Sequence, residues 1–172
     1  MSNETQDNPS REEAIAKLRN LVKGIDIAML TTLDKSGDMH SRPMSVNGDV
    51  EFDGDLWFFT RASAPKVDEI AANPKVNAAF SRPDKQDYVS LAGKAELVTD
   101  RTKIEELWKP QFKAWFPGGS DDPDIALIKV NVETAEYWDA PSSTVAQVFG
   151  FVKATLTGDS PSFGEDVKLN LK

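Results

Sequence analysis

Two apolar segments joined by a short turn restrict the fold of this chain more than any other feature of its sequence. The segments DIAMLTTL (26–33) and MHSRPMSV (39–46) are separated only by DKSGD, which contains Gly37. A connection of this length and composition is typical of a β-hairpin. The two segments are therefore predicted to be antiparallel strands.

The remaining apolar segments extend this pattern to a mainly β protein. Further strands are predicted at 55–60, 75–81, 87–98 and 125–139, and helices at 10–22, 65–73, 101–116 and 143–157. Because strands and helices do not alternate regularly, a small β-barrel or sandwich is favoured over a doubly wound sheet. We expect about six mostly antiparallel strands with a few peripheral helices.

One domain accounts for these elements. The chain has 172 residues, of which 40% are hydrophobic, and this is enough for a single core. Residues 1–9 are expected to be a disordered leader, 10–158 the folded domain and 159–172 a C-terminal tail.

Composition argues against several classes of function. The net charge is -8 and the pI is about 4.7, so the overall field repels nucleic acid and anionic lipid. The chain has no cysteine and a single histidine, His40, which argues against a zinc site. No apolar run approaches the ~18 residues of a membrane span, and the polar, acidic N-terminus does not look like an export signal. We expect a cytoplasmic protein without a metal site and without a nucleic-acid or membrane partner.

The segment LWFFTRASAPKVDEI (56–70) carries the clearest chemical signal. It begins as a strand and ends as a helix whose first turn contains Pro65. Thr60, Ser63 and Lys66 lie at this junction, where free amides, hydroxyls and a cation together favour a phosphate. Arg42 on the neighbouring hairpin strand can close over the same anion if the two strands lie as predicted.

Basic residues are concentrated in this part of an acidic chain. Six of them fall within about one quarter of its length: Arg42, Arg61, Lys66, Lys75, Arg82 and Lys85. Surface cations are often merely solvated, and that interpretation remains open from the residues alone. Their concentration nevertheless favours an anion site.

Several segments together resemble one known family. They are RPM (42–44), LWFFT (56–60) followed by Lys66, VSLAGKAE (89–96), WFPGG (115–119) and AEYWD (135–139). In this order and spacing they are similar to the general stress protein branch of the pyridoxamine 5'-phosphate oxidase-like flavoproteins, over about residues 12–158. The resemblance implies an FMN-binding split β-barrel and a homodimer with flavin at the subunit interface.

The resemblance also implies a set of cofactor-binding residues. Arg42 and Lys66 would hold the FMN phosphate, and the isoalloxazine ring would be lined by Pro43, Met44, Ser45, Phe59 and Thr60. Trp138 resembles an aromatic residue that lies near the flavin from the partner subunit. Tyr88 stands where true pyridoxamine phosphate oxidases have a glutamine that contacts the flavin.

A second departure concerns the substrate. The arginine and histidine with which those oxidases grip the substrate phosphate have no counterpart after Trp138. This argues against pyridoxamine phosphate as a substrate.

Some of these residues also have structural interpretations. Phe59 and Met44 can be core residues, and Trp108 and Trp115 can either pack a helix or cover the flavin. His40 is either a proton donor or an ordinary strand residue.

Three functional hypotheses follow. The first is an FMN-dependent oxidoreductase of unknown substrate, in which the flavin carries the redox chemistry. The second is a non-catalytic protein that stores, buffers or senses flavin during stress. The third is a dimer that has kept the barrel and lost the ligand, although a cation cluster without an anion argues against it. FAD or a deazaflavin in place of FMN stays open.

Overall fold

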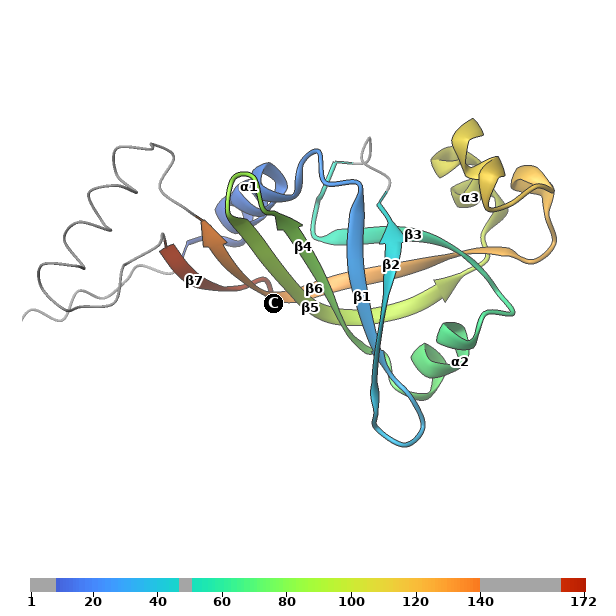
Figure 1. The fold of residues 1–172 in the computed structure, drawn as a ribbon, viewed down its shortest axis with the longest axis horizontal. Coiled ribbons are helices and arrows are strands. Elements are labelled where there is room, and N and C mark those ends of the chain that lie inside the picture. Colours follow the sequence, from blue (N-terminus) through green and yellow to red (C-terminus); the bar gives the residue numbers. More distant parts are fainter. Residues whose placement is uncertain (1–8, 47–50, 140–164) are drawn as a thin grey trace, which may run out of the picture.

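All seven strands described by the computed structural model belong to one antiparallel sheet (Figure 1). The structure describes residues 9–46, 51–139 and 165–172. The strands are β1 (Ile27–Leu33), β2 (Met39–Ser45), β3 (Asp55–Arg61), β4 (Lys75–Arg82), β5 (Asp87–Val98), β6 (Ile125–Asp139) and β7 (Glu165–Asn170). Their order is β2-β1-β4-β5-β6-β3, and β7 pairs with β6. The expected hairpin is confirmed, since Leu33 pairs with Met39 across the turn.

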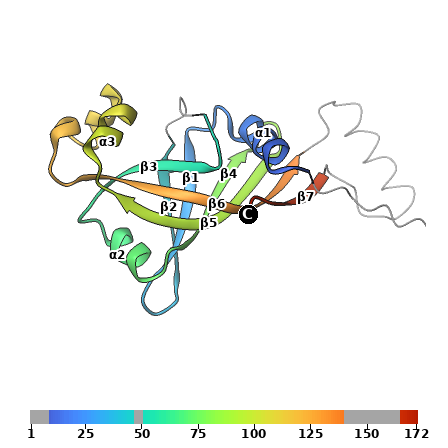
Figure 2. The same ribbon diagram turned by 180° about the vertical axis from the view of Figure 1, so that it is seen from behind.

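The helices lie toward opposite ends of the sheet, as the two views in Figures 1 and 2 show. They are α1 (Arg11–Val22), α2 (Pro65–Ala72) and α3 (Arg101–Leu107), followed by the short 3-10 segments η1 (Pro110–Ala114) and η2 (Gly119–Asp121). Helix α1 lies at one end, and α2 and α3 lie at the other. Within the described ranges, no helix is long and apolar enough to cross a membrane.

Helix α1 begins where its sequence predicts. The Ser10 hydroxyl accepts a hydrogen bond from the Glu13 amide at 3.3 Å, and the Glu13 carboxylate accepts one from the Ser10 amide at 2.8 Å. This reciprocal pair satisfies two donors that the first turn of a helix leaves free. The expected helix at 143–157 lies outside the described residues.

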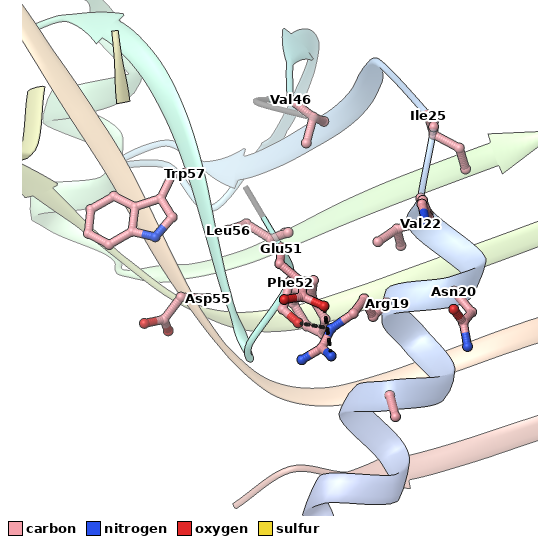
Figure 3. Close-up of a pocket in the computed structure, with 13 residues that line it drawn as sticks. Arg19, Asn20, Val22, Ile25, Val46, Glu51, Phe52, Asp55, Leu56 and Trp57 are labelled. Carbon is pink, nitrogen blue, oxygen red and sulfur yellow. Dashed lines mark hydrogen bonds and ion pairs between the residues drawn. The ribbon is translucent and has the colours of Figure 1, made fainter. Parts of the chain in front are cut away.

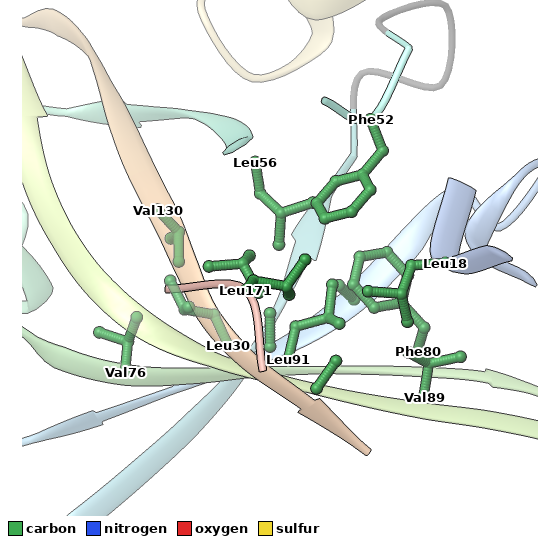
Figure 4. Packing of buried hydrophobic residues seen from close by; sticks show 14 of the residues in the cluster. Leu18, Leu30, Phe52, Leu56, Val76, Phe80, Val89, Leu91, Val130 and Leu171 are labelled. Atoms are coloured by element: carbon green, nitrogen blue, oxygen red, sulfur yellow. The ribbon is translucent and has the colours of Figure 1, made fainter. Parts of the chain in front are cut away.

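The main core fills the inner side of the curved sheet. Alternate residues of each strand point inward, including Leu30, Phe80, Leu91 and Val130, and Leu18 of α1 covers one end (Figure 4). This alternation is what a sheet with one buried face requires. The inward positions leave the intervening residues on the outer face.

Strand β6 is the longest strand, and one edge of it is shared by two partners. Its first half pairs with β3 and its second half with β7, while β5 runs along the other edge. The register of β5 against β6 shifts at Ala92/Gly93. A Cβ at Gly93 would lie 2.0 Å from the Asn131 carbonyl oxygen, so this irregularity requires glycine.

Residues 165–170 differ from the sequence prediction, which assigned 159–172 to a tail. They form β7, and Leu169 and Leu171 are buried in the main core. Arg11 of α1 also donates a hydrogen bond to the Leu171 carbonyl at 3.0 Å. This stretch is therefore an integral part of the sheet.

A second hydrophobic cluster covers the outer face of β3 and the start of β6. We call it the aromatic cluster. Its buried members are Ile104, Leu107, Phe112, Phe116, Ile125 and Leu127, with Trp57, Phe59, Val98 and Trp108 packed against them. Helix α3 and η1 thus form a cap over one region of the sheet.

Candidate functional site

The junction between β3 and α2 brings together the two cations that the sequence singled out. Thr60 is buried near the end of β3, and Pro65 opens α2. The capping position is Ala64, so no side chain caps the first amides of this helix. Lys66 follows in the first turn and donates to the Thr60 hydroxyl at 3.4 Å. Arg42 approaches from β2.

Lys66 lies close enough to Arg42 for the two positive charges to repel each other. Burial lowers the pKa of the Lys66 ammonium from its usual value, and the positive charge of Arg42 lowers it further. The carboxylate of Glu69 offsets part of this effect. Two cations at one partly buried point form an electrostatically unfavourable pair, which an anion would stabilise.

Glu69 lies at the centre of a hydrogen-bond network that includes Arg42. Its Oε2 atom accepts from Arg42 Nη2 at 2.9 Å and also from the hydroxyl of Thr32, a residue that is 0% exposed. Arg42 Nη1 donates to the same Thr32 hydroxyl. The other carboxylate oxygen, Oε1, lies 3.1 Å from His40 Nδ1. Hydrogen bonding, first from Thr32 and then from His40 and Arg42, lowers the pKa of Glu69 against the opposing effect of burial.

Ser63, which was predicted at this site, binds elsewhere. Its hydroxyl donates to Asp124 Oδ2 at 2.7 Å, and its amide donates to Oδ1 of the same residue at 2.9 Å. Arg61 lies 3.7 Å from Asp124 and donates to the Trp115 carbonyl. The turn after β3 is therefore held by Asp124, and the Ser63 side chain is engaged there instead of with Lys66.

The basic residues grouped in the sequence separate in the fold. Arg82 donates to the Lys23 carbonyl and lies 3.9 Å from Asp87, while Lys75 and Lys85 are exposed. Of the six cations, the structure brings Arg42 and Lys66 together. Proximity in the chain overestimated the size of the cluster because the six residues belong to different elements, which the fold places in different parts of the molecule.

Phe59 is likewise outside this group of side chains. Its ring centroid lies 4.7 Å from Phe112 and 5.7 Å from Trp108, inside the aromatic cluster. Phe59 and Thr60 are consecutive on β3 and so point to opposite faces. Of the two tryptophans left open by the sequence, Trp108 packs in this cluster and Trp115 is 61% exposed.

The other predicted residues are divided between the two faces of the sheet. Met44 is buried in the main core, which favours its structural interpretation. Pro43 and Ser45 alternate with it and pair with Met29 and Ile27 on the outer face.

Tyr88 and Trp138 pair with each other across β5 and β6, with exposed fractions of 42% and 37%. Like Pro43 and Ser45, they lie on the outer face, whereas Arg42 points inward. Five exposed apolar residues therefore share the outer face of the sheet: Ile27, Met29, Met39, Tyr88 and Trp138. We call this set the outer apolar face.

A separate pocket of about 530 Å³ lies between α1 and the start of β3 (Figure 3). Its wall includes Val22, Phe52 and Trp57. Arg19 reaches into it, but this side chain is held by the Phe52 carbonyl at 2.9 Å and by Glu51 at 3.0 Å. Of the described residues that line this pocket, none belongs to the predicted site.

Sequence reasoning missed Glu69 and Thr32. Glu69 follows Lys66 by three positions on α2, a spacing that places both side chains on one face of a helix. Thr32 pairs with His40 and is therefore diagonal to Arg42 across the hairpin. The helical spacing of Lys66 and Glu69 and the register of the hairpin therefore suffice to predict that both residues lie near the two cations. In the described part of the chain, no group of His, Asp and Glu residues is arranged to hold a metal.

Comparison with known proteins places the chain in a family. The family described as pyridoxamine 5'-phosphate oxidase like matches residues 13–162, and the chain belongs to it. Protein bli-3 of Neurospora crassa is 29% identical over 156 residues, which are 86% of this chain and 75% of that protein.

Two solved structures are also similar. A candidate general stress protein 26 from Jannaschia sp. CCS1 is 26% identical, with a TM-score of 0.73 over 92% of this chain and 99% of that one. The general stress FMN/FAD binding protein from Xanthomonas citri is 30% identical, with a TM-score of 0.66 over 77% of this chain and 92% of that one. The resemblance to the general stress branch and the predicted mainly β split barrel are confirmed.

Proposed function

We propose that this protein binds FMN, with the phosphate ester between Arg42 and Lys66, and serves as a flavin-dependent oxidoreductase of the general stress type. The placement of the partly buried Lys66 ammonium beside Arg42, with Lys66 donating to the buried Thr60 hydroxyl near the end of β3, carries this proposal. The FMN/FAD binding by the relative from Xanthomonas citri also supports it.

The residues at this point fit a phosphate monoester. Arg42 supplies a planar set of donors, Lys66 a point charge, and Thr60 a hydroxyl, and no side chain caps the first turn of α2. A dianion here would relieve the repulsion between the two cations. We favour FMN over FAD because FMN carries a terminal, doubly charged phosphate.

We propose further that two copies of the chain form each flavin site. The predicted cofactor-binding residues are divided between the inner side of the sheet, with Arg42, and the outer apolar face, with Tyr88 and Trp138. Within one copy these two groups lie on opposite faces of the sheet, so a partner's outer face would supply the second group. Such an apolar face is also a surface that association would bury. Sedimentation of the purified protein at one subunit mass would contradict this.

The bound flavin would supply the electron-accepting and electron-donating ring, and the protein would bind and orient it. Arg42 and Lys66 would fix one end of the ligand, and Thr60 would hold the Lys66 ammonium in place. This division of labour requires no nucleophile from the chain, which contains no cysteine.

The first experiment measures FMN affinity by fluorescence titration. Lys66→Ala and Arg42→Ala should each weaken FMN binding by about 1.5–3 kcal/mol, or roughly 10- to 150-fold, the range for hydrogen bonds to charged groups. Lys85→Ala is the matched control, because Lys85 belongs to the same basic stretch of sequence but is exposed elsewhere. Unfolding curves check that each variant is folded. Unchanged affinity in both site variants would refute the assignment.

A second experiment separates the oxidoreductase from a protein that only stores or senses flavin. The FMN-loaded protein is mixed with NADH or NADPH under anaerobic conditions, and the flavin absorbance is followed. We expect bleaching with one of them. No bleaching with either would favour the non-catalytic alternative.

A further inference from the structure

Glu69 binds the guanidinium of Arg42, which the proposed function requires for the flavin phosphate. One carboxylate oxygen of Glu69 accepts from Arg42 at 2.9 Å, and the side chain is only 13% exposed. The two ionic groups lie on different elements, α2 and β2, so their contact is a tertiary interaction. In this arrangement Arg42 is already bound to an anion that belongs to the protein.

The carboxylate is held from several sides, so it can remain in place when Arg42 leaves. Thr32 donates to Oε2, and His40 Nδ1 lies 3.1 Å from Oε1. These contacts keep Glu69 satisfied without the guanidinium. Arg42 has five N–H donors, of which the Glu69 and Thr32 contacts use two, so it can turn toward an incoming phosphate.

The charged residues of the site have opposite effects on the binding of a phosphate. Lys66 and Arg42 attract a phosphate, whereas Glu69 carries the same sign of charge as the phosphate and lies one helical turn from Lys66. Glu69 also screens the two cations from each other when no ligand is bound. Glu69 therefore offsets part of the repulsion in the site without ligand, at the expense of affinity for the ligand.

We infer that Glu69 is an internal competitor for Arg42, which sets how tightly the site holds a phosphate ester and lets a dianion displace it where weaker anions do not. This inference rests on the proposed function. Only the fraction of molecules in which Arg42 is released binds the phosphate with full strength, and the apparent affinity falls by that fraction. Glu69 would thus be a specificity-determining residue of the site.

The test compares Glu69→Gln with the wild-type protein for two ligands that differ only in the phosphate. The substitution keeps the size of the side chain and removes its charge. FMN affinity should rise by roughly tenfold, as expected if about a tenth of the wild-type molecules have a free Arg42. Riboflavin affinity should stay within about twofold of the wild type, since riboflavin does not carry the phosphate.

Glu69→Asp gives a second, graded variant. It keeps the charge but shortens the side chain by one methylene, so its FMN affinity should lie between those of the wild type and Glu69→Gln. Urea unfolding of both variants without ligand should show lower stability than the wild type, because the charge-assisted contact with Arg42 is weakened. A purely structural Glu69 would reproduce this loss but leave the ratio of FMN to riboflavin affinity unchanged.

The outcomes can be told apart. A rise in FMN affinity alone supports the inference. Unchanged or weaker FMN binding in both variants, or equal changes for FMN and riboflavin, would overturn it while the FMN site stands. If the wild-type protein itself binds no FMN, the proposed function fails and this inference falls with it.

Discussion

Phe59 and Thr60 are neighbours on β3, yet they face two regions of opposite physical character. On the Phe59 side, the rings of Trp108, Phe112 and Phe116 pack together under α3 and η1. On the Thr60 side, Arg42 and Lys66 share one carboxylate, that of Glu69. One strand thus separates an apolar cap from a charged site.

Cations occur in both regions, but the number of carboxylates that neutralise them differs. Near the aromatic cluster, Lys103 and Lys129 lie 5.0 and 5.5 Å from the centre of the Trp57 ring, and each also has a carboxylate within 3.1 Å. These contacts satisfy their charges. Arg42 and Lys66 have one carboxylate between them, that of Glu69, and the charge of Arg42 lowers the pKa of Lys66. The difference indicates that the cap contributes stability, whereas the charged site retains unfavourable energy that a ligand can relieve.

The largest expected effect is on the apolar side. Phe112→Ala removes a ring that is 4% exposed and should lower the free energy of unfolding by about 3–5 kcal/mol, the usual cost of such a cavity. Urea denaturation measures this loss. FMN affinity of the folded fraction should be unchanged, because Phe112 faces away from Arg42. A parallel loss of FMN affinity would show that the two regions are not independent.

On the charged side, a substitution is expected to raise the free energy of unfolding by a smaller amount. Lys66→Met keeps the length of the side chain and removes its charge beside Arg42. Without flavin, this variant should be more stable than the wild type by roughly 0.5 kcal/mol, a value typical of partly exposed charge pairs. The same change should weaken FMN binding. A lower stability of the variant would mean that the hydrogen bond of Lys66 to Thr60 and its attraction to Glu69 outweigh its repulsion from Arg42.

The difference in the free energy of unfolding between Lys66→Met and the wild type should depend on pH, because the pKa of Lys66 is lowered in the folded state. Below its pKa in the folded state, the lysine is charged in both states and its burial costs stability in full. Between that pKa and the usual value of 10.5, the unfolded chain binds more protons than the folded one, so wild-type stability rises with pH. The difference in unfolding free energy between Lys66→Met and the wild type should therefore become smaller toward alkaline pH. Unfolding curves recorded from neutral to alkaline pH measure it.

Much of the fold follows from local patterns. The hairpin turn, the Ser10 cap and the alternation along β4 and β5 identify their elements because each has a short-range physical cause. The faces of β3 are harder to assign, since the run Leu56 to Phe59 is apolar on both sides. Periodicity cannot distinguish a core residue from a site residue when both faces of a strand are covered.

Other features depend on contacts far apart in the chain. Strand β7 is short, and its alternating Val167 and Leu169 become a strand because an edge of β6 is available beside them. The Glu69 network joins β1, β2 and α2, and it could be expected only after these elements had been placed together. Lys66 could be singled out because its chemistry is visible at one strand-to-helix junction, and Arg42 because the predicted hairpin places it on a neighbouring strand.

The end of the β6–β7 pairing has a consequence for engineering. Asp139 and Glu165 are register partners, so the last residue of β6 lies directly opposite the first residue of β7. Two antiparallel strand ends in this register have the separation that a tight two-residue turn spans. A variant in which such a turn joins Asp139 to Glu165 would therefore keep the pairing of β6 with β7 while replacing the sequence between them.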